Sequence, residues 1–170
     1  RLISGIFNNK TTGAPINIFF ENTNIRSKDY ENLRTSPRPG HADFTAAQKY
    51  KGFNDYRGGG HFSGRLTLCL VAAGVIAKKI IQPVSVNAEL IEAGGSKNID
   101  EAVEDALTNK DSIGGIVECT AQNLPIGWGE PFFNSVESML SHMVFAIPAI
   151  KGIEFGSGFH AAGMTGSEHN

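Results

Sequence analysis

The chain has 170 residues, of which 41% are hydrophobic, and a formal net charge of -2. This content suffices for one sizeable core and suits a single domain. Domains that bind nucleic acid are normally basic, so the charge argues against that class of protein. The longest apolar run, residues 68–76, is too short to span a bilayer. We therefore expect neither nucleic acid nor a membrane as a partner.

The N-terminal part predicts short strands. Leu2–Phe7 and Ile16–Glu21 are rich in strand-forming residues and are joined by the turn Thr11–Gly13, a pattern typical of a hairpin or meander. A polar segment follows to about Tyr56 and predicts a loop.

Within this loop, Arg38-Pro-Gly-His-Ala-Asp43 places an arginine, a histidine and an acid within six residues. Its proline and glycine argue against a regular element. His41 is therefore a candidate for a working histidine, although a lone histidine is more often merely exposed or held by its neighbours.

The next segment, residues 55–67, predicts an anion-binding site. The glycines Gly58–Gly60 let the backbone approach a ligand closely. Ser63 stands where an N-cap belongs, before an apolar and hence buried helix predicted over residues 66–81, whose first N–H groups suit an anion. Arg57 and Arg65 flank this helix start with planar donors. The alternative is a tight turn with two solvated arginines.

The second half predicts alternating strands and helices. Residues 84–90 and 116–121 have strand patterns, and residues 150–155 predict a further strand. Between the first two strands, Asn98 and Glu101 have the spacing of a capping box at a helix start, and Asn134 with Glu137 has the same spacing before a second helix. The apolar face of that second helix predicts core residues: Val136, Met139, Leu140, Met143, Val144 and Ile147.

These elements predict an α+β fold with helices layered against antiparallel sheet. Cys69 and Cys119 suggest small buried side chains rather than a disulfide, which favours the cytoplasm. No Cys/His spacing indicates a metal site.

The two central segments, Arg38–Asp43 and Arg57–Arg65, closely resemble motifs of the chorismate synthase family. The resemblance covers nearly the whole chain, because further segments occur in the family's order: Phe20–Tyr30, Asp111–Gly115, Gly129–Pro131, Ile150–Glu154 and Gly166–Glu168.

The resemblance implies a β-α-β sandwich with helices packed between antiparallel sheets, usually assembled as a homotetramer. It implies a lyase that removes phosphate and a proton from 5-enolpyruvylshikimate 3-phosphate to give chorismate, with reduced flavin mononucleotide (FMN) as cofactor. A substrate with two carboxylates and a phosphate matches a site with several arginines and helix N-terminal amides.

The same resemblance assigns site residues. It implies that His41 lies near the flavin as the catalytic histidine, and that the substrate is bound by Arg38, Ser63, Gly64 and Arg65. It implies a cofactor site formed by His61, Phe62, Ser63, Pro148 and Ala149.

Two positions depart from the commonest family pattern. His61-Phe62 stands where relatives have Arg-Ser, so a cofactor contact there requires the backbone or a different side chain. Pro148 stands where relatives commonly have asparagine, and proline contributes neither an amide side chain nor an N–H group.

The family's N-terminal Gly-Glu-Ser-His-Gly motif and its C-terminal part have no equivalent here. We therefore expect residues 1–170 to be one domain, the incomplete central part of a longer enzyme, which makes no chorismate by itself. Two alternatives are a catalytically inactive structural or oligomer-forming core, and a binding module for phosphorylated metabolites that uses no flavin.

Overall fold

The computed structural model describes residues 1–23 and 26–170, so Asn24 and Ile25 of the motif Phe20–Tyr30 lie outside the described residues. The chain forms two compact units. One comprises Arg1–Ala73 with Leu140–Asn170, and the other comprises Gly74–Met139. The single domain over residues 1–170 stays a prediction.

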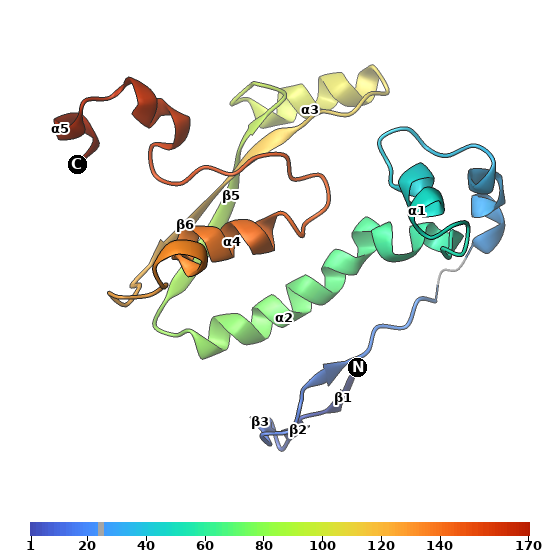
Figure 1. Ribbon diagram of the computed structural model, residues 1–170, viewed down its shortest axis with the longest axis horizontal. Coiled ribbons are helices and arrows are strands. Elements are labelled where there is room, and N and C mark those ends of the chain that lie inside the picture. Colours follow the sequence, from blue (N-terminus) through green and yellow to red (C-terminus); the bar gives the residue numbers. More distant parts are fainter. Residues whose placement is uncertain (24–25) are drawn as a thin grey trace. The chain divides into compact units, whose positions relative to one another are not determined.

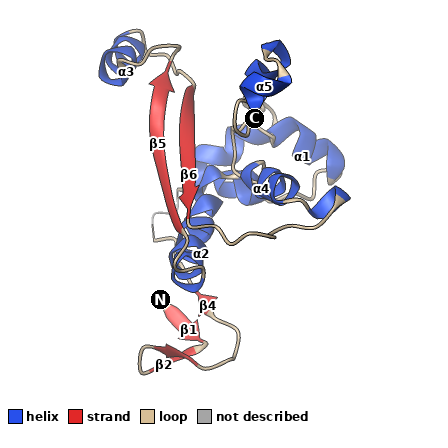
Figure 2. Ribbon diagram, turned by 90° about the vertical axis from the view of Figure 1, so that its left-hand side faces the viewer, coloured by secondary structure: helices blue, strands red, loops and turns tan. Residues whose placement is uncertain are grey.

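The N-terminal strands are antiparallel pairs (Figure 2). Strand β1 (Leu2–Ser4) pairs with β4 (Asn17–Ile18), and β2 (Ile6–Phe7) pairs with β3 (Lys10–Thr11). Asn8 and Asn9 connect β2 to β3 with φ values of 48° and 59°, which asparagine tolerates better than most residues. The predicted hairpin is confirmed, with shorter strands.

The unit Gly74–Met139 contains a long antiparallel hairpin (Figure 1). Strand β5 (Ser85–Ala93) pairs with β6 (Gly115–Gln122), from Ser85 opposite Gln122 to Ala93 opposite Gly115. Helix α3 (Ile99–Thr108) connects them at one end of the hairpin. Both strands and this helix confirm the prediction, and the helices with small antiparallel sheets confirm the α+β class.

Both predicted capping boxes are wrong. The side chain of Asn98 donates a hydrogen bond to Glu101 at 2.6 Å instead of accepting one from the backbone. Before α4 (Val136–Val144), Ser135 Oγ accepts the bond from the Ser138 N–H at 3.2 Å. A hydroxyl one residue nearer the helix therefore takes the role expected of Asn134.

The predicted loop before Tyr56 is wrong, because it contains the 3-10 helix η1 (Ser27–Arg34) and helix α1 (Asp43–Lys49). Two alanines, a glutamine and a lysine follow Asp43 and Phe44 in α1, and such residues favour a helix. Asp43 also places a negative charge at the positive end of the helix dipole. Pro39 and Gly40 therefore lie in the short connection between η1 and α1.

The strand predicted at residues 150–155 is also wrong, since this described segment has no regular structure. An apolar pattern forms a strand only where another backbone pairs with it. The remaining short helices are η2 (Arg57–Phe62), η3 (Gly64–Leu66), η4 (Phe132–Asn134), η5 (Gly158–Gly163) and α5 (Gly166–His169).

The predicted core is wrong as well. The buried hydrophobic residues of the described chain are Ala46, Val84 and Ala93. Apolar side chains of helix α2 (Thr67–Ile80) are exposed, with Val71 at 66% and Ile80 at 76%. The same holds for the predicted core residues Met139, Leu140, Met143 and Ile147, and both cysteines are exposed.

The physical reason is that helical periodicity identifies which side chains share a face, but burial also requires a second layer over that face.

In the described part of the chain, no helix is both long enough and apolar enough to cross a membrane.

Candidate functional site

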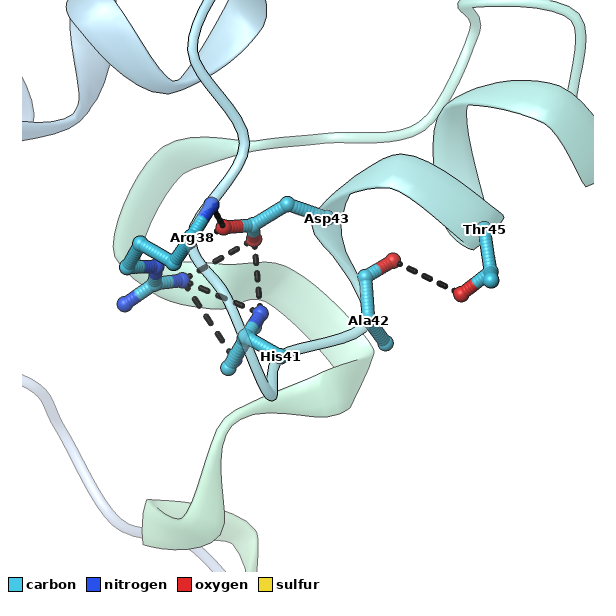
Figure 3. A network of polar contacts seen from close by, with 5 residues as sticks. All are labelled: Arg38, His41, Ala42, Asp43 and Thr45. Carbon is cyan, nitrogen blue, oxygen red and sulfur yellow. Dashed lines mark hydrogen bonds and ion pairs between the residues drawn. The ribbon is translucent and has the colours of Figure 1, made fainter.

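The loop before α1 and the first residue of that helix form a polar cluster (Figure 3). Asp43 accepts hydrogen bonds from Arg38 Nε at 2.8 Å, Arg38 Nη2 at 2.9 Å and the Arg38 backbone N–H at 3.1 Å. His41 Nδ1 lies 2.7 Å from Asp43 Oδ1. One carboxylate thus holds both an arginine and a histidine.

The hydrogen bonds from Arg38, and the nearby His41, hold the pKa of Asp43 well below its ordinary value. Asp43 in turn raises the pKa of Arg38 through the same hydrogen bonds. An ionised carboxylate is only an acceptor, so the proton in the contact at 2.7 Å belongs to His41 Nδ1. The cluster therefore fixes one protonated nitrogen of the ring and leaves Nε2 as the variable one.

The glycine loop Gly58–Gly60 packs against this histidine. Its φ values are 63°, 79° and 53°, all in the left-handed region. Gly59 is buried, and a Cβ atom added to it would lie 3.6 Å from His41 Nε2 and 3.6 Å from Ser63 Cβ. Gly59 therefore lies between His41 and Ser63, and the segments Arg38–Asp43 and Arg57–Arg65 meet there.

Ser63 caps the short helix η3 that leads into α2. Its Oγ accepts hydrogen bonds from the Arg65 backbone N–H at 3.3 Å and from Arg65 Nε at 3.0 Å. Arg65 Nη2 also reaches Tyr30 Oη at 3.5 Å. The predicted cap is confirmed, although α2 itself begins at Thr67.

A second arginine–aspartate pair precedes the glycines. Asp55 accepts from Arg57 Nε at 2.8 Å and from Nη2 at 2.8 Å, and the side chains are 54% and 63% exposed. The hydrogen bonds from Arg57 lower the pKa of Asp55 to about 2. Arg57 therefore has a carboxylate partner of its own at the surface.

A cleft of about 480 Å³, here called the Phe62 cleft, lies at the start of α2 within the unit Arg1–Ala73 and Leu140–Asn170. Apolar side chains make most of its walls and two hydroxyls and an imidazole supply polar groups. Its lining residues are Ala42, His61, Phe62, Ser63, Leu66, Thr67, Leu70, Ala146 and Pro148.

A larger cleft in the same unit, of about 990 Å³, is here called the arginine cleft. Cationic side chains come from Arg26, Arg57 and Arg65, and acidic ones from Glu21, Asp29 and Asp55. Leu66 lines both clefts. The other residues that line the arginine cleft are Phe20, Asn22, Tyr30, Gly58, Leu68 and Cys69.

The predicted site residues fall into three groups. His61, Phe62, Ser63 and Pro148 line the Phe62 cleft, and Arg65 lines the arginine cleft. Arg38 and His41 lie in the polar cluster, whose next residue, Ala42, lines the Phe62 cleft. Gly64 and Ala149 line neither cleft, and Ala149 has a φ of 71°.

Two residues of the site have stronger contacts than the sequence indicated. Asp43 is the hub of the polar cluster, and Tyr30 contacts both Arg65 and Arg38, the latter at 5.9 Å from its ring centroid. The spacing of His41 and Asp43 was a local signal for the first. No local pattern connects Tyr30 with Arg65, which lies 35 residues along the chain.

Among the described residues, no group of three or more His, Cys, Asp or Glu could hold a metal ion.

Comparison with known proteins gives a consistent result. The sequence model of a family described as chorismate synthase matches residues 1–170. A chorismate synthase of Chitinophaga pinensis is 67% identical over 168 residues, which cover 98% of this chain and 51% of that protein.

More distant relatives carry the same name. A chorismate synthase of Dehalococcoides mccartyi is 46% identical over 200 residues, covering 99% of this chain and 54% of that protein. One of Korarchaeum cryptofilum is 44% identical over 198 residues, covering 99% and 55%. The chain thus spans about half the length of the curated relatives it matches.

Proposed function

The chain belongs to the chorismate synthase family, and on this premise we propose that it contributes active-site residues for the elimination that gives chorismate. The substrate is 5-enolpyruvylshikimate 3-phosphate, which loses phosphate and a proton. The observation that carries the proposal is the meeting of His41, the glycine loop and Ser63 beside two clefts of different chemistry.

The Phe62 cleft suits the ring system of reduced FMN. Apolar walls from Phe62, Leu66 and Pro148 suit the faces of an aromatic ring system, and Ser63 and Thr67 offer hydroxyls for its polar edge. When bound, the reduced flavin supplies electron density transiently to the reacting substrate.

The two departures from the family pattern are compatible with this cleft. His61 and Phe62 line it, so an imidazole and an aromatic face replace the arginine and serine of relatives. Pro148 lines it as an apolar wall. The amide side chain that relatives have at position 148 is thereby lost, and Ala149, which has no polar side chain, offers its backbone for a cofactor contact.

The arginine cleft suits the anionic groups of the substrate. Arg65 donates to the hydroxyl groups of Ser63 and Tyr30, whereas Arg57 is paired with the carboxylate of Asp55. We assign Arg65 to a substrate carboxylate or phosphate, which bidentate guanidinium contacts recognise well. Ser63 and Gly64 contribute at the helix start, where backbone N–H groups favour an anion.

Arg38 and His41 act from the polar cluster. Asp43 occupies two nitrogens of Arg38, so the guanidinium approaches the substrate with its remaining donors and a fixed orientation. His41 keeps a proton at Nδ1 against Asp43. A second proton at Nε2 makes the ring cationic, and the positive charge then stabilises negative charge on the bound cofactor.

The exposed apolar side chains of α2 and α4 support assembly into a homotetramer, in which other protein surfaces cover them. We further propose that the chain forms part of a β-α-β sandwich and acts in the cytoplasm, where thiols such as Cys69 and Cys119 remain free. Light scattering of the purified protein tests the tetramer, and a monomer at micromolar concentration contradicts it.

The deciding experiment incubates the purified protein that carries this chain with 5-enolpyruvylshikimate 3-phosphate under anaerobic conditions. Chorismate is followed by absorbance and phosphate release by a colorimetric assay, with reduced FMN, oxidised FMN or no flavin. Turnover that requires reduced FMN supports the proposal. Substrate binding without flavin-dependent product favours the non-flavin binding module, and the absence of both favours the structural core.

A further inference from the structure

Asp43 has the hydrogen bonding of a group that holds other side chains in place. Its Oδ2 accepts from Arg38 Nε and from the Arg38 backbone N–H, and its Oδ1 accepts from Arg38 Nη2. The contact from His41 Nδ1 is the fourth. A carboxylate has about four lone-pair directions, so these partners use its capacity, and the side chain is only 12% exposed.

This arrangement selects one form of the His41 ring. The distance of 2.7 Å to Asp43 Oδ1 places the ring proton on Nδ1. Arg38 Nη2 lies 3.2 Å from Nδ1 and 3.3 Å from Nε2. A guanidinium only donates and cannot accept a proton from either ring nitrogen, so the acceptor for the Nδ1 proton is Asp43.

The other edge of the ring meets the glycine loop. His41 Nε2 would lie 3.6 Å from a Cβ atom added to Gly59, and Ser63 Cβ would lie equally close to that atom. A rotation of the imidazole would therefore change the contact between the two motifs. With Nδ1 on Asp43, the ring thus presents its Cε1 and Nε2 edge toward Gly59.

We propose that Asp43 is a positioning residue, which fixes the orientation and the Nδ1–H tautomer of His41 against the glycine loop while holding Arg38 through the same carboxylate. The proposal deepens the proposed function and rests on it for the catalytic consequence. The ring geometry itself can be tested without turnover. The exposed Asp55, which accepts hydrogen bonds from Arg57, provides a matched control.

The first measurement is nitrogen NMR of the purified protein with isotope-labelled histidine, assigned by the loss of one pair of ring-nitrogen resonances in His41→Gln. In the unaltered protein at alkaline pH, we expect His41 Nδ1 to carry a proton. A ring protonated at Nε2 alone overturns the proposal. This arm needs no Asp43 variant, so it is decisive even if a substitution prevents folding.

The second measurement compares Asp43→Asn, Asp43→Glu and Asp55→Asn. Asparagine can donate to Nδ1, so we expect Asp43→Asn to move the His41 proton to Nε2 and to lower kcat by about 10-fold or more with a smaller change in KM. Asp43→Glu retains a carboxylate and should restore the Nδ1 proton. Asp55→Asn should leave the tautomer unchanged. An unchanged tautomer in Asp43→Asn overturns the proposal even if kcat falls.

The two levels of inference can fail separately. If the tautomer follows the Asp43 substitutions while no form of the protein makes chorismate, the positioning role is supported and the proposed function is contradicted. If chorismate is made but the His41 tautomer is the same in the parent protein and in the Asp43 variants, the proposed function stands and the positioning role is overturned.

Discussion

The two arginine–aspartate pairs differ in surroundings although their chemistry is the same. In each, a carboxylate accepts two side-chain hydrogen bonds from one guanidinium. Asp43 is 12% exposed and also holds His41, whereas Asp55 is 54% exposed and lies two residues from its arginine. An identical pair of residues thus organises a polar cluster in one place and is a solvated local contact in the other, because burial and a third partner decide the outcome.

The largest expected effect tests His41, the additional partner of Asp43. His41→Ala should lower kcat by about 100-fold or more, because it removes a positioned charge or proton, while KM changes less. Steady-state turnover with reduced FMN measures this. His142→Ala, on the exposed side of α4, is the matched control and should leave turnover unchanged. Equal turnover of His41→Ala and the parent protein would mean that His41, and with it the Arg38–Asp43 pair that holds it, has no part in catalysis.

The next effect concerns the backbone beside the second pair. Gly60 has φ 53° and ψ -134°, and a Cβ atom there would collide with the Asp55 carbonyl oxygen. Gly60→Ala should therefore lower the free energy of unfolding by about 1–3 kcal/mol, measured in urea.

Gly74→Ala is the control for this substitution. Nothing lies within 4 Å of a Cβ atom at Gly74, which is inside α2. Alanine should be neutral or stabilise the helix by up to about 1 kcal/mol. If both substitutions change the free energy of unfolding equally, the Asp55 carbonyl does not constrain the backbone at Gly60.

A smaller effect compares the two carboxylates directly. Asp43→Ala should lower the free energy of unfolding by about 1–2 kcal/mol, because Arg38 and His41 lose their shared acceptor. Asp55→Ala should have no measurable effect, since exposed ion pairs contribute little. Urea unfolding of both variants at neutral pH makes the comparison. A larger loss for Asp55→Ala would reverse the ranking of the two pairs.

The smallest effect is in the pH dependence. Folding lowers the pKa of Asp43 from its ordinary 3.8 by hydrogen bonding to Arg38, and lowers that of Asp55 to about 2. For a lowered pKa, the stabilisation is complete above the unfolded value and is lost as pH falls through the folded value. The stability difference between the parent protein and Asp43→Asn should therefore be largest above pH 3.8 and shrink below it. A difference that grows on acidification would contradict this sign.

Several elements of the fold were predictable because their signals are local. Helix α2 has an apolar run after a capping serine, and β5 and β6 have strand patterns bounded by turns. Helix α1 was missed because Pro39 and Gly40 suggested a continuous loop, although the residues from Asp43 onward favour a helix. The strand predicted at residues 150–155 failed because pairing depends on a partner that a pattern does not specify.

The sequence by itself determined the family, the motifs and the residue types of the candidate site. These follow from side-chain chemistry and order along the chain, which do not depend on packing. The tertiary structure alone decided that His41 shares Asp43 with Arg38 and meets Gly59, that Arg65 reaches Tyr30, and that the faces of α2 and α4 are exposed. Such contacts depend on distances between separate segments, and a periodic pattern reports only which side chains share a face.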